Sequence, residues 1–163
     1  MKWFENALNS ALASGLNVMV ANHYPLPNFE KISCNFTSID KDGGSGYKTG
    51  KYQVKIADFK HKGGSFICFI GGHMHGDLIG VNTIYSDQLC ICIDALSRTQ
   101  SNQYSDTQRT TDTKSQDLAN ALIVDTSSKV IKIIRIGANI DRYLRFKNSI
   151  TINYENLNII SEN

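Results

Sequence analysis

The chain has 163 residues, which is enough for one domain with a hydrophobic core. Its formal net charge is only +2 and no segment carries a basic cluster, so the sequence gives no reason to expect nucleic acid as a partner. No apolar run approaches the roughly 20 residues of a membrane span, and the N-terminus lacks a signal-peptide core. We therefore predict a cytoplasmic protein that does not enter a membrane.

The first predicted elements are a helix and a strand. Apolar residues recur at four-residue spacing between Phe4 and Leu12, and Gly15 can cap the resulting helix. A short apolar strand, Leu16–Ala21, follows and must end before Pro25, which cannot donate to a ladder. His23 is thus predicted to lie at the C-terminal end of a strand.

The next segment, Asn28–Gly50, is polar and rich in glycine, which favours a functional or mobile loop. Asp40 and Asp42 resemble the start of a calcium loop, but the later ligands of such a loop are missing.

A second helix and strand are predicted after this loop. Thr49 can cap a helix whose apolar face runs from Tyr52 to Phe59 and which ends at Gly63. His61 falls in the last turn, where a solvated histidine is favourable. The apolar run Ser65–Ile70 then predicts a buried strand, and this alternation of helices and strands implies parallel strands with helical crossovers.

Two histidines one residue apart, His73 and His75, directly follow this strand. Neutral imidazole is a common ligand of zinc, manganese and iron, and ligands of α/β sheets bind at the carboxyl ends of the strands. With His23 they form a candidate metal-binding trio. The alternative is that His23 and His73 only form hydrogen bonds at strand ends while His75 is exposed.

The pattern in the second half of the chain predicts further strands that form an antiparallel sheet. The predicted strands are Val81–Tyr85, Gln88–Asp94, a hairpin of Ala119–Val124 and Val130–Ile136, and a final pair of Tyr143–Phe146 and Ile150–Tyr154. The polar stretch Arg98–Asp117 predicts a surface loop or a disordered segment. No repeat or linker is visible, so residues 1–163 are predicted to form a single α/β domain.

The four cysteines are Cys34, Cys68, Cys90 and Cys92. No C-x-x-C motif occurs, and residues two apart on a strand do not favour a mutual bridge. We interpret them as reduced, small apolar side chains, with zinc ligation by Cys90 and Cys92 as the alternative.

The histidines in this setting resemble the C-terminal half of the calcineurin-like metallophosphoesterases. The segment Asn22-His23-Tyr24-Pro25 is similar to the family's His-x-Pro turn, and Gly72-His73-Met74-His75 is similar to its Gly-His-x-His motif. The matched stretch runs from about Trp3 to Asp77, and the tail Lys132–Arg142 resembles phage- and prophage-encoded members.

The resemblance implies a partial αββα sandwich and a hydrolase that cleaves phosphate esters. It implies that His23 and His73 ligate one ion, and His75 the other, of a pair of divalent metal ions (Mn, Fe or Zn). Such a pair would clamp the substrate and generate a hydroxide nucleophile.

The sequence departs from the family in lacking the Asp-x-His, Gly-Asp and Gly-Asn-His motifs that precede the matched region. Gly76-Asp77 follows the last motif, so it cannot take the role of the second. Without a bridging carboxylate we expect at most one bound ion and little activity from this chain alone. An N-terminal half supplied by another polypeptide would then be a partner of this chain. Alternatively, the chain would form a homo-oligomer through an exposed strand edge.

Two other functions stay open. One is a non-catalytic structural or interaction domain derived from the same fold, such as a component of a phage particle. The other is a mononuclear zinc-binding domain in which Asp77 or a water joins the three histidines.

Overall fold

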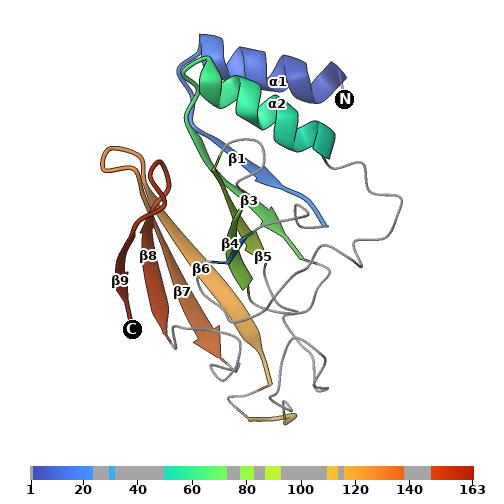
Figure 1. The fold of residues 1–163 in the computed structure, drawn as a ribbon. Helices are drawn as coiled ribbons and strands as arrows, with labels where there is room; N and C mark the ends of the chain where they lie inside the picture. Colours follow the sequence, from blue (N-terminus) through green and yellow to red (C-terminus); the bar gives the residue numbers. More distant parts are fainter. Residues whose placement is uncertain are drawn as a thin grey trace.

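A computed structural model describes residues 2–23, 30–31, 50–72, 78–82, 87–92, 110–113, 116–137 and 148–163. Within these residues the chain forms three layers: two helices, a first sheet and a second sheet (Figure 1). The helices cover one face of the first sheet, and the second sheet packs on its other face. This arrangement confirms a mixed α/β fold with two sheets.

The helix layer consists of α1 (Lys2–Ala13) and α2 (Gly50–His61). Gly15 adopts a φ of 63° after α1, and Gly63 adopts a φ of 90° after α2. These left-handed conformations are common at helix ends, and glycine adopts them without the steric cost of a Cβ. The two helices are joined by an ion pair between Lys55 Nζ and Glu5 Oε1 at 2.8 Å. Both helix predictions and both glycine caps are confirmed.

The first sheet has five strands in the order β1-β3-β5-β4-β2. Their bounds are β1 (Val18–Ala21), β2 (Glu30–Lys31), β3 (Phe66–Gly71), β4 (Leu78–Asn82) and β5 (Gln88–Cys92). Strands β1, β3 and β5 are parallel, whereas β4 runs antiparallel to β5 and β2 antiparallel to β4. The predicted parallel pairing of the first two apolar strands is therefore confirmed.

The second sheet is a four-stranded antiparallel meander in the order β6-β7-β8-β9. Its strands are β6 (Leu118–Asp125), β7 (Val130–Gly137), β8 (Ser149–Asn153) and β9 (Ile159–Glu162). The β6–β7 hairpin is confirmed, with its turn held by the Asp125 carboxylate. The predicted strand Tyr143–Phe146 lies outside the described residues, and β8 pairs instead with β9, which the sequence analysis did not predict.

The pairing of β5 differs from the prediction. The pattern after Asp77 predicted an antiparallel sheet, and β5 does pair antiparallel with β4, but on its other side it pairs in parallel with β3. The reason is that β5 is buried on both faces: Cys90 lies under the helices, while Leu89 and Ile91 face the second sheet. A strand with two buried faces is suited to the middle of a sheet, where it pairs with β3 on one side and with β4 on the other.

Neither helix in the described parts of the chain has the length and apolar character that a membrane crossing requires.

Candidate functional site

The candidate site lies at the edge of the first sheet where β1, β3 and β5 end. Because these strands are parallel, their carboxyl ends meet at one edge, and Ala21 pairs with Ile70 while Gly71 pairs with Cys92. The residues that follow β1 and β3 are therefore neighbours. This is the edge at which the sequence predicted a metal site.

His23 follows β1 by two residues, and its side chain is exposed. Its carbonyl oxygen accepts a hydrogen bond of 2.8 Å from the backbone N–H of Gly72. Asn22 N–H also donates to the carbonyl of Ile70 at 2.9 Å, so the ladder between the two strands extends past the end of β1. The structure thus holds the backbone of His23 beside the residue that precedes His73.

Three of the predicted ligands, His73, His75 and Asp77, lie outside the described residues. The described residues on either side of this segment are Gly72 and Leu78. Gly71 pairs with Cys92 from one side and Leu78 pairs with it from the other, so both ends of the segment begin at the sheet edge that carries His23.

Glycine at position 72 permits a close approach without being required for it. A Cβ built on Gly72 would meet the carbonyl oxygen of His23 at 3.6 Å, an ordinary van der Waals separation. The steric demand for glycine at this position is therefore mild. This backbone link is the part of the site that the sequence analysis did not identify, and no residue type in the sequence signals it.

The other candidate ligands do not gather in the described structure. His61 is the last residue of α2 and is exposed, as expected for a solvated histidine. Cys90 is buried against the helices with Sγ directed to the carbonyl of Gln88, and the side chain of Cys92 lies outside the described residues. Asp40 and Asp42 also lie outside them. Among the described residues no three His, Cys, Asp or Glu side chains form a group that could hold a metal ion.

The two cysteines in the described core are buried. Cys68 and Cys90 are buried and form no disulfide bond, and burial raises the pKa of the Cys68 thiol to about 12. A thiol with so high a pKa stays protonated at neutral pH and is a poor nucleophile and metal ligand. This supports the interpretation of both as small apolar side chains.

Comparisons with known proteins assign neither a family nor a function to the chain. No protein-family model, curated protein or solved structure matches the chain. Any statement about its function therefore depends on the sequence motifs and on the geometry described above.

Proposed function

We propose that this chain is the C-terminal portion of a metal-dependent phosphoesterase of the calcineurin-like type, with His23, His73 and His75 as ligands of divalent metal ions. One observation carries the proposal. The hydrogen bond from Gly72 N–H to the His23 carbonyl brings two sequence motifs that are about fifty residues apart to the same sheet edge. This proximity is what a metal site shared by the two motifs requires.

The layer order also supports the proposal. An αββα sandwich requires two stacked sheets with helices outside them, and the described residues supply helices, sheet and sheet in that order. The fourth layer has no counterpart among them. We propose that it belongs to the segment that completes the enzyme.

The donor set of three neutral imidazoles fits Zn²⁺, Mn²⁺ or Fe²⁺ but leaves their charge uncompensated. An ion held there would polarise a phosphate ester and lower the pKa of a nearby water. Carboxylate ligands from the completing segment would supply the missing charge. On its own, the chain is proposed to bind one ion weakly and to hydrolyse phosphate esters slowly or not at all.

Metal content tests the proposal. The purified chain is dialysed to equilibrium against Mn²⁺ or Zn²⁺, and the metal bound at several free concentrations is measured by mass spectrometry for the wild type, His23→Ala and His61→Ala. We expect the His23 variant to lose about tenfold in metal affinity, because a first ligand is removed. His61→Ala is the matched control, since that exposed histidine lies at the far end of α2 from this edge, and it should change nothing. Equal metal content in all three proteins would contradict the site.

The alternative of a non-catalytic interaction domain is favoured by one observation. Ile123, Ile136 and Ile160 lie on β6, β7 and β9 of the second sheet and are 55–56% exposed, so they offer apolar surface to another protein. A protein with this function would retain no metal dependence even when the completing segment is present. Activity of the completed protein toward a simple aryl phosphate therefore separates the two candidates.

A further inference from the structure

The four edge strands of the two sheets differ in their protection against pairing with another chain. β2 has two residues, both charged, and β9 has four residues and ends in a serine and a glutamate. β1 carries no charge but is only four residues long. β6 has eight residues, no bulge in its pairing with β7, no proline, and no charge before its last residue, Asp125. Long, apolar edge strands without such protection are the ones that associate with other chains.

The backbone groups of β6 can be assigned to its two sides from the neighbouring strands. Arg135 N–H donates to the carbonyl of Asn148 at 2.8 Å, so the odd-numbered residues of β7 face β8. The even-numbered residues of β7 therefore face β6 and bond the odd-numbered residues opposite them. It follows that Leu122 and Val124 direct their N–H and C=O groups away from β7. In the described part of the chain no strand lies on that side, where β6 forms the edge of the sheet (Figure 1).

The outer face of β6 is apolar as well. Leu122 and Val124 pack against the cluster between the sheets, so Ala121 and Ile123 lie on the opposite face. Ile123 is 55% exposed there, and Ala121 lies directly opposite Ile134 of β7. A strand added beside β6 would thus meet a large apolar side chain and, two residues away, a small one.

We propose that β6 pairs with β6 of a second copy of this chain, antiparallel, about a two-fold axis that passes between the two copies of Leu122. The two four-stranded sheets then form one continuous sheet. Leu122 N–H donates to the carbonyl of the partner's Leu122, and the symmetry supplies the reverse bond. Ile123 lies opposite the partner's Ala121, which leaves room for the isoleucine beside the partner's Ile134. This contact is independent of the proposed metal site.

Charge and length select this register. An axis one residue earlier would set Asp117 of each copy opposite Asp125 of the other, and like charges directly opposite are destabilising. An axis one residue later would shorten the paired stretch. With the axis at Leu122, residues 119–125 of both copies pair, and each Asp125 lies opposite an alanine. The strand therefore fits a copy of itself without a charge conflict and with large side chains set against small ones.

The oligomeric state tests the proposal. The paired stretch is smaller than a standard interface, so we expect a weak dimer that sedimentation velocity detects between about 1 µM and about 1 mM chain. Ile123→Glu should raise its dissociation constant at least about tenfold, because a charge would be desolvated against the partner. Within one chain Glu would lie opposite Lys132, so the variant should fold. Ile160→Glu is the matched control, since Ile160 is 56% exposed but lies on β9, and its dimer should be unchanged.

Cross-linking tests the register. Ala121→Cys and Ile123→Cys are made as separate variants, mixed, and oxidised. Directly opposite residues of a non-hydrogen-bonded pair have Cα atoms about 4.5 Å apart, which suits a disulfide. We expect the mixture to form the 121–123 disulfide, identified by peptide mass spectrometry, faster than either variant cross-links with itself. The wild type is oxidised in parallel to account for the native cysteines.

Hydrogen exchange distinguishes the other occupants of this edge. The amides of Leu122 and Val124 should exchange at least about tenfold more slowly when the dimer predominates than in the dilute monomer. Three outcomes would overturn the proposal. The chain could stay monomeric at every concentration, or form a dimer that Ile123→Glu does not weaken. The two amides could also be equally slow in the monomer, which would show that another segment of the same chain covers the edge.

Discussion

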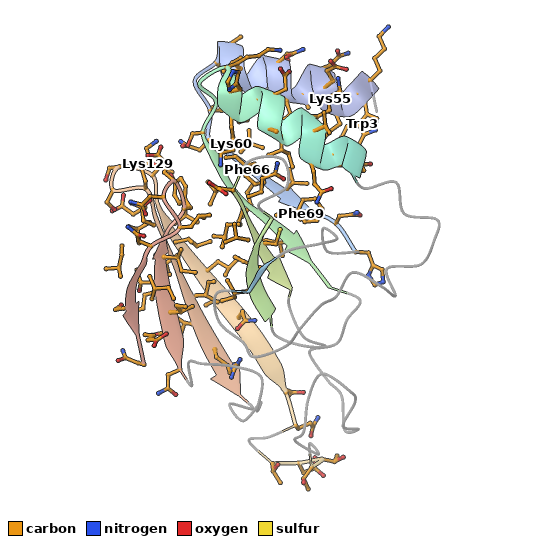
Figure 2. The ribbon with its side chains drawn as sticks, in the orientation of Figure 1. Trp3, Lys55, Lys60, Phe66, Phe69 and Lys129 are labelled. Atoms are coloured by element: carbon orange, nitrogen blue, oxygen red, sulfur yellow. The ribbon has the colours of Figure 1, made fainter. Side chains whose placement is uncertain are left out.

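The two faces of the first sheet are filled by different side chains. Under the helices the buried cluster is mainly aromatic, and it consists of Phe4, Leu8, Ile56, Phe59, Phe66, Phe69 and Cys90. Between the sheets it is mainly aliphatic, and it consists of Ile67, Cys68, Ile79, Leu89, Ile91, Ile131, Ile133, Ile150, Ile152 and Tyr154. Figure 2 shows the side chains that fill the space on both sides of the first sheet.

The difference follows from the shapes of the layers. A helix is a cylinder and leaves uneven gaps against a sheet, and phenylalanine rings are long enough to fill them. Two sheets present regular pleated surfaces, on which β-branched side chains pack with few voids. The helix layer therefore depends on a few large side chains, and the second sheet on many medium-sized ones.

The largest effect is expected at Phe69, which is 1% exposed beneath the helices. Phe69→Ala should lower the free energy of unfolding by about 3–5 kcal/mol, because a whole ring is lost and the helices cannot collapse into the space. Urea denaturation followed by circular dichroism measures the change. A loss below about 1 kcal/mol would mean that the helix layer is loosely packed.

A smaller effect is expected between the sheets. Ile133→Val removes one methylene from a fully buried side chain and should cost about 0.5–1.5 kcal/mol, because its many neighbours share the contact. The same urea titration gives the value. A loss in the free energy of unfolding as large as that of Phe69→Ala would show that one isoleucine dominates the contact between the sheets. The second sheet would then not depend on many medium-sized side chains.

The smallest effect is expected on how stability depends on pH. The Asp125 carboxylate accepts hydrogen bonds from the N–H and hydroxyl groups of Ser127 and Ser128, which lower its pKa well below the usual 3.8. On the helix layer, the Asp58 pKa is lowered by a 2.7 Å contact with Lys62. A carboxyl with a lowered folded-state pKa stabilises the fold above its unfolded pKa, and this contribution is lost as pH falls toward the folded-state value.

Asp125→Asn should therefore reduce stability at pH 6, and its difference from the wild type should shrink below about pH 4. Asp58→Asn is the comparison in the helix layer, and its effect should also fade in about 1 M salt, because an exposed ion pair is screened. Thermal unfolding at several pH and salt values measures both. An Asp125→Asn difference that does not vary with pH would contradict the role of the charge.

The sequence was sufficient for elements with strong local patterns. The apolar face of α2 and its glycine cap predicted the helix, and the alternation in the β6–β7 hairpin predicted both strands. Strand partners were harder, because periodicity does not reveal which strand lies next to β5. Strand β9 was missed because it is short and its two apolar residues, Ile159 and Ile160, are adjacent rather than alternating; it is held by its pairing with β8.

For the candidate site, the sequence predicted that His23 follows a strand and that this strand is parallel to β3, and both are confirmed. It could not predict the hydrogen bond from Gly72 to the His23 carbonyl, because a contact between backbones so far apart in the chain leaves no mark on residue type. The convergence of His23 with His73 and His75 stays a prediction.

The connectivity of the two sheets has a consequence for the order of assembly. Each strand of the second sheet pairs with its neighbour in sequence, and the β6–β7 and β8–β9 connections are short and cheap to close. In the first sheet, β1 must wait for β3, which emerges from the ribosome nearly fifty residues later. Local hairpins form faster than such distant pairings. The face of the second sheet that packs on the first sheet carries Ile131, Ile133, Ile150 and Ile152. This face is therefore at risk of aggregation during biosynthesis whenever formation of the first sheet is delayed.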